Sequence, residues 1–222
     1  MSNAKKALKN GIYGIIGQVI LYVVRFIDRK VFLMFLSIEL LGYNSLFSDI
    51  FNLLSVAELG IGSIIIYNLY KAFATNDNNE ISVLVSIYKL VYQFVGIFVL
   101  ILGIVLSFFL KYVIRDNSFN WSYIYVVYFL ILTNTVFSYF LSYKATLYAV
   151  AQKDYITVRV NVITNIIFSF IKLVSLIAFK NFIVYLVLSI TNSILINLII
   201  YLKSKQDFPH VVDDVKITID DV

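Results

Sequence analysis

The feature that most constrains this chain is its division into long apolar blocks, each of about twenty residues or more, separated by short polar breaks. About twenty apolar residues of helix cross the hydrocarbon core of a bilayer, whereas the strands of a membrane barrel are shorter segments of alternating polarity. Apolar residues make up 61% of the sequence and charged residues only 14%, so the composition is not that of a soluble domain. The sequence therefore predicts an all-α, polytopic membrane protein.

Six transmembrane helices are expected from these blocks, and together they would form one helical unit over residues 1–205. Residues 206–222 are polar and acidic, and we expect them to form a cytoplasmic tail or the start of a linker to a further lobe. Some blocks exceed the thickness of the bilayer, so those helices must tilt, bend or extend beyond the lipid. The expected spans are approximately residues 11–37, 46–70, 83–113, 121–148, 156–179 and 182–202.

The distribution of lysine and arginine predicts a protein of the cytoplasmic (inner or plasma) membrane with both termini in the cytoplasm. Cations are retained on the cytoplasmic side of a membrane protein, and here they gather before the first span and after the second, fourth and sixth. That group consists of Lys5, Lys6, Lys9, Lys71, Lys144, Lys153, Lys203 and Lys205. The connections on the opposite side carry Lys111, Arg115 and Lys180.

Four charges interrupt the first apolar block in the run RFIDRK, residues 25–30. As a loop, this run would leave flanking pieces too short to cross a bilayer, so we interpret it as part of one membrane-spanning helix. Arg25, Asp28 and Arg29 lie at spacings of three and four residues and therefore share one helix face. A charge at the centre of such a helix costs about 2.5 to 3.5 kcal/mol, so this face should line a polar cavity or a network of paired charges.

Two interpretations of these charges stay open. In the first, Asp28 offsets one arginine, and the remaining cations bind an anion such as phosphate or pyrophosphate, which accepts paired hydrogen bonds from guanidinium groups. In the second, a salt bridge joins the first helix to an acid of a neighbouring helix, Asp49 or Glu58. Those two carboxylates could also bind a cation or a proton, because an unpaired carboxylate in lipid is costly.

Polar side chains recur at helical intervals in the later spans. Lys172 is the other cation deep in a span, and it either snorkels toward the interface or lines a cavity. Small polar residues at such intervals fit either close helix packing or a cavity wall, and Gly60 and Gly62 would allow the second span to bend. The carboxamides that we assign to a cavity wall are Asn52, Asn134, Asn161 and Asn165, and those that we assign to contacts between helices are Asn192 and Asn197.

Several function classes lack their motifs in this sequence. It contains no cysteine and one histidine, so neither a metal site nor a cofactor is expected. It has no phosphate-binding glycine loop, nucleophile elbow or His-Glu-His spacing, and we do not expect an enzyme. The net charge of +5 is scattered over the connections, which does not indicate nucleic-acid binding.

A family resemblance is carried mainly by residues 42–71, GYNSLFSDIFNLLSVAELGIGSIIIYNLYK. This run resembles the second-helix signature of bacterial oligosaccharide flippases of the polysaccharide transporter type, in the multidrug/oligosaccharidyl-lipid/polysaccharide exporter superfamily. AELGIGS is the specific part, and RFIDRKVF, QKDYI and KNFIVYL support it in the same order along residues 10–202. The resemblance implies one lobe of a two-lobe transporter that flips a lipid-linked oligosaccharide across the cytoplasmic membrane for cell-surface polysaccharide synthesis.

The resemblance also implies the site and the partners. A central cationic cavity would hold the pyrophosphate of a polyprenyl-linked oligosaccharide during alternating access, and the residues that match those of the family are Arg25, Asp28 and Arg29. We add Lys172 to the candidate binding residues because it is a cation deep in a span. Six helices correspond to the amino-terminal lobe, so we expect a truncated frame, a split gene whose partner supplies the second lobe, or a homodimer of lobes. The alternatives are a multidrug exporter lobe, for whose cationic substrates the positive first helix is unfavourable, and a remnant that does not transport.

Overall fold

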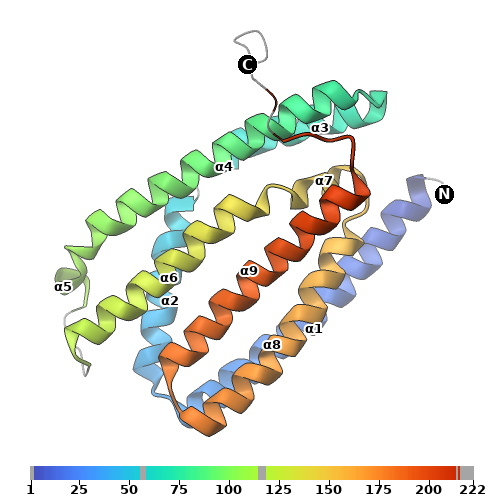
Figure 1. Cartoon of the computed structure of the whole chain (residues 1–222). Coiled ribbons are helices and arrows are strands. Elements are labelled where there is room, and N and C mark those ends of the chain that lie inside the picture. Colours follow the sequence, from blue (N-terminus) through green and yellow to red (C-terminus); the bar gives the residue numbers. More distant parts are fainter. Residues whose placement is uncertain (1–2, 56–58, 115–118, 214, 216–222) are drawn as a thin grey trace.

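All the regular secondary structure in the described part of this computed structural model is helical, and that part comprises residues 3–55, 59–114, 119–213 and 215 (Figure 1). This confirms the predicted all-α class. The longer helices are α1 (Asn3–Phe35), α4 (Asn78–Ser107), α6 (Trp121–Ser142), α8 (Tyr155–Phe179) and α9 (Phe182–Asp207). The shorter ones are α2 (Ile38–Ser55), α3 (Leu59–Thr75), α5 (Leu110–Val113) and α7 (Ala145–Val150).

Five helices in the described residues are long and apolar enough to cross a membrane, namely α4, α6, α8, α9 and the Ala7–Phe35 part of α1. The chain is therefore a multi-pass membrane protein by the length and composition of its helices. The second predicted span, 46–70, corresponds instead to two shorter helices, because α2 ends at Ser55 and α3 begins at Leu59.

Other predicted boundaries also differ from the structure, and the third predicted span, 83–113, is divided between α4 and α5. The polar run at residues 39–45 is predicted to separate the first two spans, but it lies inside α2, and the chain turns at Leu36 and Ser37. The Ser37 hydroxyl oxygen accepts a hydrogen bond from the Leu40 N–H at 3.4 Å, which satisfies one of the donors left free at the start of a helix. The fourth predicted span, 121–148, is divided between α6 and α7.

The remaining polar breaks end and begin helices as expected. Asp77, Asn120 and Asn181 each accept hydrogen bonds from backbone N–H groups in the first turn of the helix that follows. Lys180 ends α8 with a left-handed φ of 47°, a conformation that closes many helices. Local side-chain chemistry thus explains why these connections are short.

The long helices pack as a row in the order α1, α8, α9, α6 and α4, with α3 beside α4 and with α2 against α6 and α4 (Figure 1). The start of α1 and the end of α9 lie at the same end of the bundle, together with α7 (Figure 1). We call this the terminal end of the bundle. An arrangement with both termini at one end agrees with the topology predicted from the lysines, and the cytoplasmic side remains a prediction from those charges.

Neighbouring helices approach closely where one of them carries glycine. Gly17 of α1 lies against the side chain of Val158 in α8, and Gly103 of α4 lies against Leu132 in α6. A Cβ at Gly103 would stand 2.5 Å from a Leu132 methyl carbon, so no larger residue fits without displacement. Such small residues let helices pack in a membrane, where burial of apolar surface gives little driving force.

Candidate functional site

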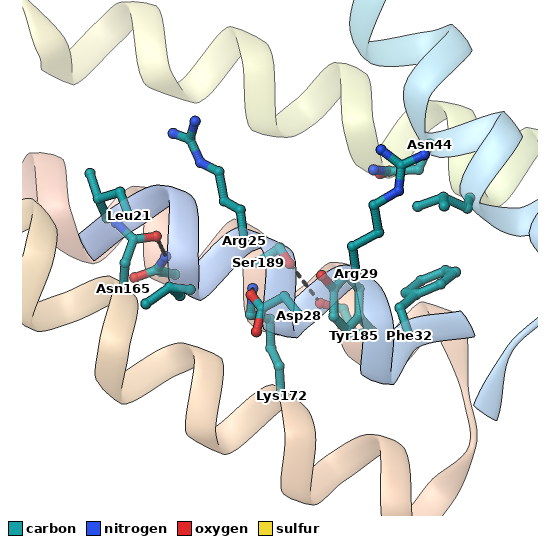
Figure 2. A pocket seen from close by; sticks show the side chains of 13 residues that line it. Leu21, Arg25, Asp28, Arg29, Phe32, Asn44, Asn165, Lys172, Tyr185 and Ser189 are labelled. Carbon is teal, nitrogen blue, oxygen red and sulfur yellow. Dashed lines mark hydrogen bonds and ion pairs between the residues drawn. The ribbon is translucent and has the colours of Figure 1, made fainter. Parts of the chain in front are cut away.

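A cavity of about 300 Å³ lies between α1, α2, α8 and α9, and Figure 2 shows its lining. Most of the polar groups that line it come from helices that are otherwise apolar, so the cavity is a polar region inside the bundle. Its charged and polar lining residues are Arg25, Asp28, Arg29, Asn44, Asn165, Lys172, Tyr185, Ser189 and Asn192.

The charged run of the first helix is helical throughout. Residues 25–30 lie inside α1, so the interpretation of this run as a loop between two short helices is wrong. Asp28 is buried, whereas Arg25 and Arg29 are exposed. Figure 2 shows both arginines extending from one side of α1 and Asp28 pointing toward α8. The three side chains therefore divide into a buried acid and two accessible cations.

The partner of Asp28 is Lys172 of α8, not an arginine of its own helix. Lys172 Nζ lies 2.8 Å from Asp28 Oδ2, and the Ser169 hydroxyl donates a hydrogen bond to Asp28 Oδ1. Lys172 Nζ also lies 5.0 Å from the ring centroid of Tyr185 in α9. Because Lys172 is buried and turned toward Asp28, it does not snorkel to the interface. This pair joins α1 to α8 and neutralises one charge of each sign.

Arg25 and Arg29 carry the net positive charge of the cavity. Within the described residues, no carboxylate forms an ion pair with either guanidinium group, and the Arg25 guanidinium lies 5.9 Å from the ring of Tyr22 on its own helix. Asp49, one of the two acids considered as a partner for the first helix, is exposed and also forms no ion pair in that part of the chain. Glu58, the other, lies outside the described residues.

An uncharged polar wall lies between α2 and α6. Asn52 and Asn134, both expected in a cavity wall, line a second cavity of about 400 Å³ together with Ser48, Thr135 and Ser138. The side-chain oxygen of Asn134 is buried there with no hydrogen-bond partner in the described part of the chain. This wall offers donors and acceptors without net charge.

The other two predicted carboxamides differ from each other. Asn165 lines the cationic cavity, and its Oδ1 accepts a hydrogen bond from Asn192 Nδ2 at 3.1 Å, which is the contact between helices expected of Asn192. Asn161 lines neither cavity, because its side chain turns back to donate to the Thr157 carbonyl oxygen at 2.9 Å. A carboxamide one helical turn from a cavity can satisfy its own helix instead.

Four polar lining residues were not singled out as cavity residues from the sequence. Tyr185, Ser189 and Asn192 of α9 lie at spacings of four and three, which places them on one helix face and was the signal available. Asn44 of α2 precedes Ser48 and Asn52 at spacings of four, so it begins the stripe that continues into the uncharged wall.

Comparisons of this chain with protein-family models, curated proteins and solved structures find no match. The resemblance to oligosaccharide flippases therefore rests on the sequence runs given above, and function has to be argued from the cavity. Among the described residues, Arg25 and Arg29 have no carboxylate partner, and α2 contributes polar side chains both to their cavity and to the neutral wall. Guanidinium groups in this setting can bind an anion, and the neutral wall can bind hydroxyl or amide groups.

Proposed function

We propose that this chain is a lobe of a transporter that moves a polyprenyl pyrophosphate-linked oligosaccharide across the cytoplasmic membrane for cell-surface polysaccharide synthesis. The observation that carries the proposal is the division of charge on α1. Asp28 is neutralised by Lys172, while Arg25 and Arg29 face the cavity without an ion pair among the described residues. Charges in membrane helices are costly and mark the pathways of charged substrates.

The cationic cavity and the neutral polar wall match the pyrophosphate and the sugar parts of such a substrate. Guanidinium groups donate paired hydrogen bonds to phosphate oxygens, so Arg25 and Arg29 would hold the pyrophosphate. The neutral wall with Asn52 and Asn134 would face sugar hydroxyls, which need donors and acceptors and no counter-charge. No covalent bond is made or broken in this function, so the chain would be a transporter and not an enzyme.

A second lobe would complete the pathway. Arg25 and Arg29 are exposed, and exposed guanidinium groups at membrane depth require cover by protein or water and not by lipid tails. A further helical lobe, supplied by the same polypeptide, by a partner chain or by a second copy, would enclose the substrate between two such faces and allow alternating access.

A multidrug exporter lobe is the other transporter candidate, and the charges of the cavity disfavour it. An organic cation would meet two positive side chains, and the nearby carboxylate, Asp28, is already bound to Lys172 and Ser169. Electrostatic complementarity therefore favours an anionic substrate over a cationic one.

Binding of farnesyl pyrophosphate to the purified full chain in detergent tests the proposal. Replacing both Arg25 and Arg29 by Gln should weaken binding by about tenfold or more, since hydrogen bonds to charged groups contribute about 1.5 to 3 kcal/mol each. Lys30→Gln is the matched control, because Lys30 is exposed on the same helix and does not line the cavity. Tetraphenylphosphonium serves as the cationic probe.

Equal affinity of the double variant and the unmodified chain for farnesyl pyrophosphate would overturn the assignment of the arginines. Tight binding of tetraphenylphosphonium that displaces the pyrophosphate would favour the multidrug exporter instead. If neither probe binds, the result would favour a chain that does not transport.

A further inference from the structure

Two cations share one pair of tyrosine rings at the terminal end of the bundle. Lys9 Nζ lies 3.6 Å from the ring centroid of Tyr155 and 6.0 Å from that of Tyr13. The Arg159 guanidinium carbon lies 5.3 Å from the Tyr13 centroid and 5.9 Å from the Tyr155 centroid. We call these four residues the Lys9–Arg159 cluster. It brings together α1 and α8.

Hydrogen bonds fix the cluster from both helices. Arg159 Nη2 donates to the Tyr13 hydroxyl at 3.0 Å, and the Tyr155 backbone N–H donates to Asn10 Oδ1 at 3.2 Å. The two rings are 5.9 Å apart, within the range of aromatic contacts. The Arg159 charge is therefore positioned by a hydrogen bond to α1, and the Lys9 charge lies over the Tyr155 ring of α8.

The positive charge of the cluster is not neutralised by a carboxylate in the described part of the chain, where neither Lys9 nor Arg159 forms an ion pair. Asp154, the carboxylate nearest to Arg159 in sequence, accepts a hydrogen bond from the Thr157 hydroxyl instead. Ring faces attract cations but carry no net charge. Two like charges held together in this way favour the approach of an anion.

Exposed apolar side chains continue from the cluster along both helices. On α8, exposed apolar residues follow Arg159 at spacings of three and four residues toward the middle of the bundle. On α1, exposed apolar residues follow Lys9 at the same spacings. The exposed apolar residues of these two faces are Ile163, Ile166, Ile167 and Phe170 on α8 and Ile12, Ile16 and Val19 on α1. An anion with hydrocarbon chains fits this arrangement better than a free ion.

We propose that the Lys9–Arg159 cluster binds the phosphate of an anionic phospholipid, whose acyl chains lie along the exposed apolar faces of α1 and α8. Basic sites between transmembrane helices recruit such lipids from the leaflet that contains them. The distribution of lysines assigns the terminal end to the cytoplasmic leaflet. This site is separate from the arginine cavity, and the proposal does not rest on the transport function.

Quenching of a single tryptophan by brominated lipids tests the proposal in the full chain reconstituted into vesicles. Trp121, the one natural tryptophan, is replaced by Phe, and Ile163→Trp places the reporter one turn beyond Arg159, where the side chain is exposed. Vesicles contain phosphatidylglycerol and phosphatidylcholine in a fixed ratio, with the bromine on the acyl chains of one lipid or the other. Brominated phosphatidylglycerol should quench the reporter more strongly than an equal amount of brominated phosphatidylcholine.

Four variants distinguish binding of the lipid at the Lys9–Arg159 cluster from nonspecific attraction of anionic lipid to other basic residues of the protein. Arg159→Gln should lower the preference for phosphatidylglycerol by about fivefold, the effect of one cation near an anionic surface, and adding Lys9→Gln should abolish it. Arg159→Lys should keep most of the preference, which shows that the reporter still lies in a folded bundle. Lys71→Gln removes an exposed lysine from α3 and should leave the preference unchanged.

Three results would overturn the proposal. One is equal quenching by both lipids with the cluster intact, and another is a preference that survives loss of both cations. The third is a preference abolished by millimolar inorganic phosphate, which would assign the cluster to free phosphate instead of a lipid.

Discussion

Lys144 Nζ lies 3.2 Å from Asp213 Oδ2, and this ion pair joins the junction of α6 and α7 to the chain that follows α9. Lys144 is only 2% exposed, although lysine is among the residues least often buried. The Tyr143 hydroxyl donates a second hydrogen bond to the same Asp213 oxygen at 2.5 Å. The Asp213 carboxylate thus neutralises the buried charge of Lys144 at the terminal end of the bundle.

The backbone of the same segment is held by two serines of α4. The Val212 N–H donates to Ser82 Oγ at 3.1 Å, and the Val215 N–H donates to Ser86 Oγ at 3.2 Å. The serines lie one helical turn apart, so they present acceptors at two levels along α4. Val212, Asp213 and Val215 therefore link α4 to the α6–α7 junction.

Replacing Asp213 by Asn should destabilise the protein by about 3 kcal/mol, because it leaves the Lys144 charge buried without its partner. Thermal unfolding in detergent, followed by helical circular dichroism, measures the effect. The double variant Asp213→Asn, Lys144→Met should recover most of the loss, since the unpaired charge is gone. Lys203→Gln, which breaks a partly exposed pair with Asp207 at 4.0 Å, is the control and should cost less than about 1 kcal/mol. Additive losses in the double variant would contradict the pairing.

The contribution of Asp213 should depend on pH in a defined direction. Burial raises the pKa of Asp213, but the hydrogen bond from Tyr143 and the charges of Lys144 and Lys89 outweigh it and hold the pKa below its ordinary value of 3.8. A group whose pKa is lowered by folding stabilises the folded state above its unfolded pKa, and this stabilisation is lost as pH falls through the folded pKa. The free energies of unfolding of the unmodified chain and of Asp213→Asn should therefore differ by a constant amount above about pH 5 and converge below about pH 4. Convergence that began near neutral pH would contradict the lowered pKa.

The sequence predicted the class of the fold because long apolar blocks have few alternatives, and it predicted that RFIDRK would be helical because a loop there would leave pieces too short to span. It could not predict which residue pairs with Asp28. Helical spacing places Arg25 and Arg29 near Asp28 along one helix, but the contact with Lys172 depends on the packing of α1 against α8, between residues 144 positions apart in sequence. Pairing between distant helices has no local signal in a single sequence.

The same limit explains the differences at the helix ends. The run at residues 39–45 is polar enough to resemble a connection, yet it is part of α2 because the chain has already turned at Ser37. Asn161 and Asn165 share a spacing of four, but only Asn165 reaches the cavity, where Asn192 of α9 meets it. A polar residue in a membrane helix needs a hydrogen-bond partner, but the sequence does not show whether its own helix backbone or another helix supplies that partner.

Asp28→Asn should destabilise the protein strongly, by about 3 to 5 kcal/mol, because Lys172 would keep a buried charge without a counter-ion. The double variant Asp28→Leu, Lys172→Met should be considerably more stable than either single change, since apolar residues can replace a buried pair at little cost. Arg25→Gln is the control on the same helix and should change stability by less than about 0.5 kcal/mol, because that side chain is exposed. If Asp28→Asn and Arg25→Gln had equal effects on thermal unfolding, the assignment of Lys172 as the partner would be wrong.

Gly17→Ala should destabilise the protein, whereas Gly11→Ala on the same helix should stabilise it. A Cβ at Gly17 would overlap the side chain of Val158, whose branched Cβ allows little rotation, so α1 and α8 would have to separate. A Cβ at Gly11 meets nothing within 4 Å, and alanine in an exposed helix interior is favoured over glycine by about 1 kcal/mol. Opposite shifts of the unfolding temperature are therefore expected from one chemical change at two sites six residues apart. Stabilisation by both substitutions would show that α1 and α8 are not in close contact at Gly17.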